Sequence, residues 1–361
     1  MTPHPELLHS AKAVRLWLAV VIAMVFGMVV VGGITRLTGS GLSMVEWEPI
    51  MGVIPPLSDA DWTAAFEAYK QYPQYRLTHP DMDLAGFQGI FFWEYVHRVL
   101  GRSIGMAFAL PFFWFLARGT FARPLAFRLG IALLLGGLQG FVGWLMVKSG
   151  LVDEPRVSHF RLAAHLGLAL TIIAYLGWVL LSLRPHAIAM DTARTGIPRS
   201  LLRLLTALVA VQIVYGAFVA GLRAGWGYNT FPRMGDRWVA EAVMAMDPWW
   251  LNLLEDHATV QFMHRLLGTL LVFAVGAIWL RYRNSARDRV QRHGLDLLFG
   301  LVLTQYALGI YTLVNVVPLV PAVMHQGCAA LIVLALVTVL SRSSGRWMST
   351  ENTALTGAAS A

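Results

Sequence analysis

The sequence is poor in charged residues and almost without cysteine. Only 13% of its 361 residues are Asp, Glu, Lys or Arg, whereas an ordinary globular domain carries about 25%. Cys328 has no intrachain partner, which excludes an internal disulfide and a cysteine-rich metal cluster. Hydrophobic residues make up 57% of the chain. This balance excludes disorder, a fibrous repeat and a secreted disulfide scaffold, and it favours a membrane protein.

The positive net charge by itself says little about partners. The chain carries 28 basic and 20 acidic residues, a formal charge of +8, which in a soluble protein would suggest nucleic acid. In a membrane protein the placement of the charges matters more than their sum. We therefore expect no nucleic-acid partner.

Eight apolar runs are long enough to cross a bilayer, for which about 20 residues are needed. They cover residues 14–33, 97–116, 126–147, 161–183, 201–222, 259–280, 294–314 and 318–341. The first run follows Lys12 and Arg15, as in a signal peptide, but no small-residue cleavage site is evident. We expect it to be retained as a transmembrane helix.

The distribution of charge predicts the orientation of these helices. Sixteen of the 28 Lys and Arg residues fall on the side of the N-terminus and nine in the opposite loops, whereas fifteen of the 20 acids lie on the opposite side. By the positive-inside rule both termini face the cytoplasm of a bacterial inner membrane, or the matrix of a mitochondrion. The acidic loops face outward.

The longest outer loop, about residues 34–93, contains one helical pattern. Ser58 and Asp61 resemble a capping box, and Trp62, Phe66 and Tyr69 follow at helical spacing. Two readings stay open: an amphipathic helix on the outer membrane surface, or a loop helix that packs on the protein and has no role in chemistry.

The two halves of the chain repeat each other. Residues 94–101, EYVHRVLG, match residues 261–268, QFMHRLLG; Gln139 and Gly143 match Gln305 and Gly309; and His165 matches His325. Each half contains four spans, so the halves share one orientation and are parallel repeats. We predict an all-α integral membrane protein of two four-helix bundles, residues 1–200 and 201–361.

Four histidines lie inside the predicted spans at one depth near the outer face: His97, His165, His264 and His325. Each has a glycine or alanine four residues later, on the same helix face: Gly101, Ala169, Gly268 and Ala329. Paired imidazoles beside such clearance suit a flat macrocycle with iron between two axial nitrogens, and two pairs imply two haems. Hydrogen bonding near helix ends, or a Zn or Cu site, is the alternative.

One difference between the halves points to chemistry. Glu94 lies one turn before His97, and its repeat mate is the amide Gln261. A carboxyl group beside a haem pocket can accept protons or position water, so the N-terminal half is the candidate catalytic half. The alternative is that Glu94 occupies a first helical turn, where the helix dipole favours an acid.

Arg98 and Arg265 either pair with haem propionates or extend to the membrane interface.

Three further residues are assigned structural roles. Gln139 and Gln305 are expected to bond between helices rather than to bind a ligand, and Cys328 to be a small buried hydrophobe.

These motifs resemble the haem A synthases of the α-proteobacterial and mitochondrial type. The resemblance rests on residues 32–47, GGITRLTGSGLSMVEW, on Pro55-Pro56, on residues 94–98, EYVHR, and on the second His-Arg pair with the two late histidines. It runs from about residue 17 to about residue 341. The long opening motif is the most specific part.

The resemblance implies an integral membrane oxidoreductase that converts haem O to haem A for cytochrome oxidase assembly. It oxidises the C8 methyl group by successive hydroxylation to a formyl group. His97 and His165 carry over as ligands of the substrate haem, with Glu94 as the catalytic acid. His264 and His325 carry over as axial ligands of a haem b that transfers electrons.

The resemblance also implies partners and leaves one mechanism in doubt. Haem O synthase is the expected supplier of substrate, membrane lipid surrounds the chain, and the oligomeric state, a homo-oligomer included, stays open. Some relatives carry cysteine pairs in outer loops, and this chain has none. An iron with two histidine ligands has no open position for oxygen, which favours electron removal from the methyl followed by attack of water.

Two other functions remain as alternatives. A diheme b-type cytochrome that exchanges electrons with a quinone would use the same histidines. A transporter built on parallel repeats would instead need a midplane site with broken helices.

Overall fold

The computed structural model describes residues 5–45, 54–150, 157–183 and 196–343. Eight long helices follow one another, with two short helices, α2 (Asp59–Lys70) and α3 (Pro73–Thr78), between the first two. The long helices are α1 (Pro5–Leu37), α4 (Leu84–Ala117), α5 (Arg123–Gly150), α6 (His159–Ser182), α7 (Arg199–Gly221), α8 (His257–Tyr282), α9 (Arg289–Val314) and α10 (Leu319–Ser341). The end of the opening motif, Glu46 and Trp47, lies outside the described residues.

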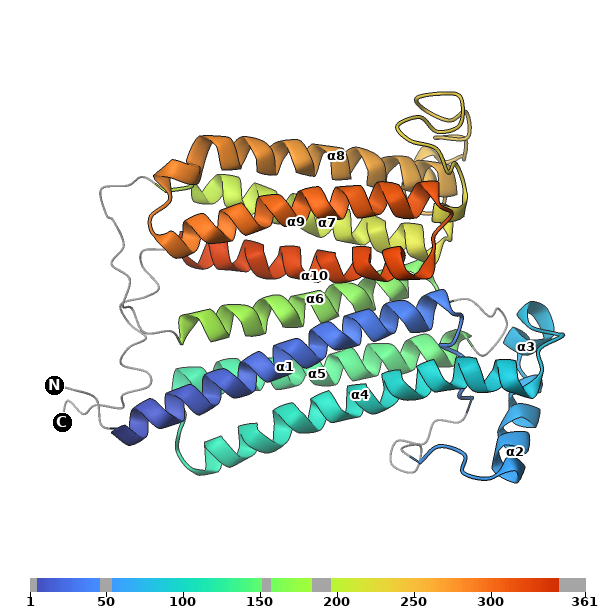
Figure 1. The fold of residues 1–361 in the computed structure, drawn as a ribbon, viewed down its shortest axis with the longest axis horizontal. Coiled ribbons are helices and arrows are strands. Elements are labelled where there is room, and N and C mark those ends of the chain that lie inside the picture. The colour runs from blue at the N-terminus through green and yellow to red at the C-terminus, as the bar shows by residue number, and fades with distance from the viewer. Residues whose placement is uncertain (1–4, 46–53, 151–156, 184–195, 344–361) are drawn as a thin grey trace.

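The protein is an all-α multi-pass membrane protein, as the sequence predicts. In the described ranges all eight long helices are long and apolar enough to span a bilayer. A helix suits this role, since only a helix or a closed barrel satisfies its backbone groups in hydrocarbon. Helix α1 begins and helix α10 ends at the same end of the molecule, opposite to α2 and α3 (Figure 1). This placement follows from the even number of spans.

Helix α4 is the element whose start the sequence misplaces. It begins at Leu84, thirteen residues before the expected start at residue 97, and the Asp83 side chain caps it by accepting from the backbone N–H of Gly86. Its first turns carry Gln88 and Glu94 among apolar residues and belong to the span Leu84–Ala117. They form a helix because Phe87 and Phe91 are buried in a separate cluster of the outer region.

Helix α2 is the partner of these first turns of α4. Its capping box is formed in both directions between Ser58 and Asp61, as predicted. Phe66 stacks on Phe87 at 5.1 Å between ring centroids, and Tyr69 on the same ring at 5.2 Å. The helix thus packs on α4, which confirms the packing expected for a loop helix.

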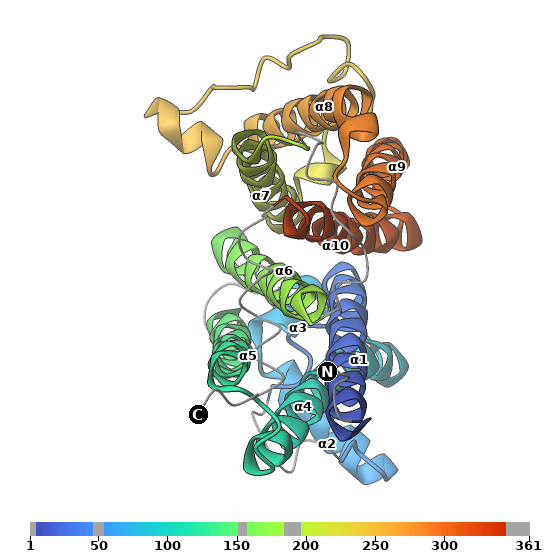
Figure 2. The same ribbon diagram turned by 90° about the vertical axis from the view of Figure 1, so that its left-hand side faces the viewer.

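The long helices fall into two groups. In Figure 2, α1, α4, α5 and α6 lie together in the lower part and α7, α8, α9 and α10 in the upper part. One buried apolar cluster is drawn mainly from the first group and includes Leu18, Phe112, Leu129 and Ile173. A second cluster comes from the other group and includes Leu202, Val275, Leu298 and Leu336. That these groups are repeats of one unit stays a prediction.

Helices α1 and α6 of one group meet α7 and α10 of the other (Figure 2). Gln326 on α10 donates to the carbonyl oxygen of Val29 on α1 at 2.6 Å, and the Arg36 guanidinium donates to the carbonyl of Ala220 at the end of α7. Gly221 ends α7 so close to α6 that a Cβ atom there would lie 2.6 Å from Cα of His159. The contact between the groups at the outer side therefore requires glycine at position 221.

We expect Gly221→Ala to destabilise the protein by about 1–3 kcal/mol, the usual cost of overpacking. The added methyl group must push α6 and α7 apart. Gly130→Ala on α5 is the matched control, because a Cβ atom at that position has no neighbour within 4 Å and alanine is the better helix former. Thermal unfolding in detergent, followed by tryptophan fluorescence, measures both variants. Equal melting temperatures would contradict the close approach.

Candidate functional site

The four histidines of the repeat lie on α4, α6, α8 and α10. His165, His264 and His325 are within the first turns of α6, α8 and α10, as expected. The same expectation is wrong for His97, which lies about four turns into α4, since that helix begins at Leu84. The extra turns place the beginning of α4 beside α2, beyond the level of His97.

His264 and His325 come together as a pair. The ring centroids of His264 and His325 are 6.4 Å apart, with the ring planes at 78°. Two imidazoles that bind one metal ion from opposite sides, with bonds of about 2 Å, place their ring centres about 6 Å apart. The His264–His325 spacing therefore fits a shared axial metal, as in haem.

Three of the rings rest on a glycine of the preceding helix. A Cβ atom on Gly143 would lie 3.1 Å from Cε1 of His165, and one on Gly216 would lie 3.1 Å from Cε1 of His264. On Gly309 it would lie 2.9 Å from Cε1 of His325. The nearest ring atoms follow in the same order each time, Cε1, then Nδ1, then Nε2. All three rings therefore have the same packing against their neighbour helix.

A glutamine one turn before each of these glycines contacts the same ring. Gln139 Nε2 lies 3.2 Å from His165 Nε2, Gln212 Nε2 lies 3.1 Å from His264 Nδ1, and Gln305 Nε2 lies 3.2 Å from His325 Nε2. The predicted interhelical bonding of Gln139 and Gln305 is confirmed, and the bonded atom is an imidazole nitrogen.

The amide oxygens of these glutamines are buried and without a partner. Gln139, Gln212 and Gln305 each leave Oε1 unpaired among the described residues, and a buried unpaired acceptor is costly. If the side-chain amide is rotated by 180°, Oε1 and Nε2 exchange places, and Oε1 accepts from a ring N–H instead. For His325 that proton is already placed, because Nδ1 donates to the backbone oxygen of Gln305 at 3.0 Å. The Nε2 lone pair of His325 therefore faces the Gln305 amide nitrogen at 3.2 Å in this structure, and a metal ion would take the place of that contact.

Gln212 and Gly216 are the site residues that sequence reasoning missed. The comparison of the halves used the Gln139–Gly143 and Gln305–Gly309 pairs alone. The same four-residue spacing recurs at 212–216, on the helix before His264, and this spacing was the available signal.

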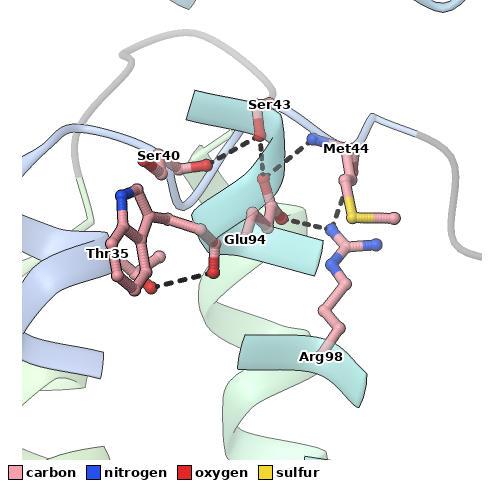
Figure 3. A network of polar contacts seen from close by, with 7 residues as sticks. Thr35, Ser40, Ser43, Met44, Glu94 and Arg98 are labelled. Atoms are coloured by element: carbon pink, nitrogen blue, oxygen red, sulfur yellow. Dashed lines mark hydrogen bonds and ion pairs between the residues drawn. The ribbon is translucent and has the colours of Figure 1, made fainter. Parts of the chain in front are cut away.

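Glu94 is buried and fully engaged on α4 (Figure 3). Its Oε2 accepts from the hydroxyl of Ser43 at 2.7 Å and from the backbone N–H of Met44 at 2.8 Å, and its Oε1 accepts from Arg98 at 2.5 Å. Arg98 also donates to the carbonyl oxygen of Met44. Three donors match a carboxylate, which only accepts. Glu94 and Arg98 together fix the segment that follows α1, at Ser43 and Met44, against α4.

Glu94 is not in a first helical turn, so the helix-dipole alternative is wrong. Its repeat mate Gln261 is buried on α8 and also holds a loop, with the opposite polarity. Gln261 Nε2 donates to the carbonyl oxygens of Ala224 and Gly227 at 2.7 and 2.5 Å, and Oε1 accepts from Arg265 at 3.0 Å. An acid suits a loop that offers donors, and an amide suits a loop that offers carbonyls.

Arg265 resembles Arg98 in contacting the outer loop of its own half. Its guanidinium donates to the carbonyl oxygens of Tyr228, Thr230 and Arg233. Both predicted propionate ligands are therefore placed beside their histidines, and both bind loop carbonyls in this structure.

The outer segment over Glu94 is closed by a second set of buried polar contacts. The Tyr69 hydroxyl lies 3.0 Å from Nδ1 of His79, and Gln74 donates to the carbonyl oxygen of Gly39 at 2.7 Å. Burial, followed by the nearby negative charge of Glu94, raises the pKa of Tyr69, so its hydroxyl stays protonated. Burial lowers the pKa of His79, which favours the neutral ring. The contacts of Tyr69 with His79 and of Gln74 with Gly39 are thus hydrogen bonds between neutral groups.

Cys328 is buried, as predicted for a small hydrophobe. Its thiol lies 3.5 Å from the carbonyl oxygen of Leu301 on α9.

Known proteins resemble the chain along most of its length. The sequence model of the family described as "Cytochrome oxidase assembly protein" matches residues 15–337. A protein of Nitrosospira multiformis named "Heme A synthase" is 47% identical over 327 residues, 90% of this chain and 91% of that protein. Proteins of the same name from Bradyrhizobium sp. (strain ORS 278) and Rhodospirillum centenum are 46% and 47% identical, covering 96% and 92% of this chain and 95% and 88% of their own lengths.

We expect Gln261→Glu to destabilise the protein by about 1–3 kcal/mol at pH 8, because it turns a carboxylate oxygen toward two carbonyl oxygens that then lack a donor. Gln261→Met, which removes the hydrogen bonds without adding charge, is the reference. The melting temperature in detergent measures the difference. If Gln261→Glu melts no lower than Gln261→Met, the polarity of the loop contact is not what selects the amide.

Proposed function

Because the chain belongs to the family of cytochrome oxidase assembly proteins, we propose that it is a haem A synthase. Its substrate is haem O, its product is haem A, and the reaction oxidises the C8 methyl group to a formyl group. The observation that carries the proposal is the pairing of His264 with His325, whose ring centroids are 6.4 Å apart. The similar proteins reported above are named "Heme A synthase". The enzyme is an oxidoreductase of the membrane.

The two haem sites are assigned to the two groups of helices. We place the substrate haem in the half of residues 1–200, between His97 and His165, and a resident haem b in residues 201–361, between His264 and His325. Each half is proposed to be a four-helix bundle. The glycines under three of the rings support this assignment, since a methyl group at Gly143, Gly216 or Gly309 would displace the imidazole.

Haem b, when bound, supplies one-electron transfer. The histidines that would hold it orient rather than react: the Nδ1 proton of His325 is held by the Gln305 backbone oxygen, so Nε2 is the nitrogen that would bind the metal once the Gln305 amide turns away from it. A fixed tautomer and ring orientation raise ligand basicity. We assign Arg98 and Arg265 to the propionates as well as to the loop carbonyls, because a guanidinium has five donors.

Glu94 is proposed to act on the protons released by the oxidation. Conversion of a methyl group to a formyl group with oxygen from water releases four protons and four electrons. The electrons would leave one at a time through haem b to an oxidant outside the chain, and a carboxylate within the site can take protons. The Ser43 hydroxyl, which is within reach of both Glu94 and the carbonyl oxygen of Ser40, can turn from the carboxylate to that carbonyl. One acceptor site on Oε2 is then open, while the Met44 N–H still occupies the other. The negative charge also steadies a cationic intermediate.

The cellular setting follows from the same proposal. The relatives reported above come from bacteria, so we place the chain in the inner membrane. The excess of Lys and Arg on the N-terminal side favours cytoplasmic termini. Haem O synthase is the proposed supplier of substrate.

Pigment extraction tests the function. In a host that makes haem O but lacks its own haem A synthase, expression of the chain should produce haem A. We expect His97→Ala to keep haem b and to accumulate haem O, and His264→Ala to lose bound haem b. Haem type and stoichiometry in the purified variants are the measurement. A wild-type protein that binds two haems but yields no haem A would point to the diheme cytochrome instead.

Glu94→Gln tests the acid. We expect the variant to retain haem but to lose formyl production by about a hundredfold, the effect typical of removing a general base. Glu94→Asp keeps the carboxyl group at a shorter reach and should retain part of the activity. Haem A formation per bound haem is measured. Full activity in Glu94→Gln would remove Glu94 from the mechanism and leave it as the residue that holds Ser43 and Met44.

A further inference from the structure

The four histidines are not held alike, and the exception is His97. Among the described residues its ring makes no hydrogen bond, whereas His165, His264 and His325 each have a glutamine. The glycine beneath it is Gly32 on α1, and a Cβ atom there would lie nearest Nε2, at 3.4 Å, and then Cδ2. The other three rings present Cε1 first. His97 is therefore turned differently on its glycine.

The residue that stands where the other helices have glutamine is Met28. It precedes Gly32 by four residues, as Gln212 precedes Gly216. The structural equivalence is independent of this spacing. A Cβ atom on Gly101, four residues after His97, would lie 3.1 Å from Cε of Met28, and one on Gly268, four residues after His264, would lie 3.1 Å from Nε2 of Gln212. Met28 and Gln212 thus occupy the same place in their helix pairs.

A thioether cannot replace the amide at this place. Methionine has no donor and is a weak acceptor, and it is flexible. A ring without such a partner lacks the hydrogen bond that would select its tautomer. Loss of an outer hydrogen bond to a ligand histidine typically weakens metal affinity by about 10–100-fold.

We propose that Met28 makes His97 the first ligand of its pair to dissociate, whereas both ligands of the resident haem stay bound. The inference rests on the proposed function. A haem that is substrate must arrive and its product must leave, so both axial bonds in the N-terminal half have to open in every cycle, and the His97 bond opens first. A resident haem has no such need, and both of its ligands are held by amides. Met28 is a positioning residue that acts through His97.

The test introduces the missing amide. Met28→Gln restores the pattern of the other three helix pairs, and Met28→Leu, which adds no polar group, is the reference. Met28→Asn supplies an amide that is too short to reach the ring. Purified proteins reconstituted with haem b are mixed with excess apomyoglobin, and haem transfer is followed by absorbance. The ferric spin state is recorded by electron paramagnetic resonance.

We expect release from the N-terminal half to slow by about tenfold or more in Met28→Gln relative to Met28→Leu, by the effect of a second hydrogen-bonded shell. The high-spin signal should fall in the same variant, and Met28→Asn should behave like Met28→Leu. Gln212→Met is the reciprocal change and should speed release from the C-terminal half alone. A Met28→Gln protein that releases haem at the Met28→Leu rate, with an unchanged spin state, would overturn the proposal.

The outcome is separable from that of the proposed function. Haem release and spin state are read with haem b, so they report on His97 whether or not the chain makes haem A. Failure to convert haem O would contradict the function and leave the release measurement valid. Slower conversion in Met28→Gln with unchanged release would also contradict the role of Met28, since only a general structural effect would remain.

Discussion

The contact between an imidazole and a glycine of the neighbouring helix is the constraint on which the arrangement of the site depends. At Gly143, Gly216 and Gly309 even one methyl group would come within about van der Waals contact or closer of a histidine ring. The helix pairs α5–α6, α7–α8 and α9–α10 can therefore bring a histidine inward only where the preceding helix has no side chain. Each glutamine, one turn away, then lies beside a ring nitrogen. Packing and hydrogen bonding thus set the direction of the ring together.

A second constraint acts at the outer side, where each half must hold its own loop. Glu94 and Gln261 occupy equivalent helical positions, yet one accepts from a hydroxyl and a backbone N–H and the other donates to two carbonyls. The choice of acid or amide thus follows the polarity of the facing loop. An interpretation of this difference in terms of chemistry alone is incomplete. The buried carboxylate with its arginine is at once a structural contact and the candidate proton acceptor of the N-terminal half.

Several features could be predicted because they depend on local pattern. Apolar runs identify the helices, since the bilayer requires backbone satisfaction within each span, and the capping box at Ser58 depends on residues three positions apart. The start of α4 could not be predicted, because Phe87 and Phe91 are buried by α2, a contact between separate segments. The packing of α2 on α4 could not be predicted for the same reason, since it too is a contact between separate segments. The role of Gln212 depended on a contact with His264 across two helices, although its spacing from Gly216 was visible.

The sequence by itself determined the membrane class, the number of spans, the repeated His-Arg motif and the family, because each of these is a property of residue type and order along one chain. Only the tertiary structure decided that the rings of His264 and His325 lie 6.4 Å apart, that Glu94 accepts from Ser43, Met44 and Arg98, and that Met28 lies beside Gly101 as Gln212 lies beside Gly268. These facts depend on the relative positions of helices that are distant in the sequence. The way in which these helices cross is set by close packing at glycines, which hydropathy and spacing do not encode.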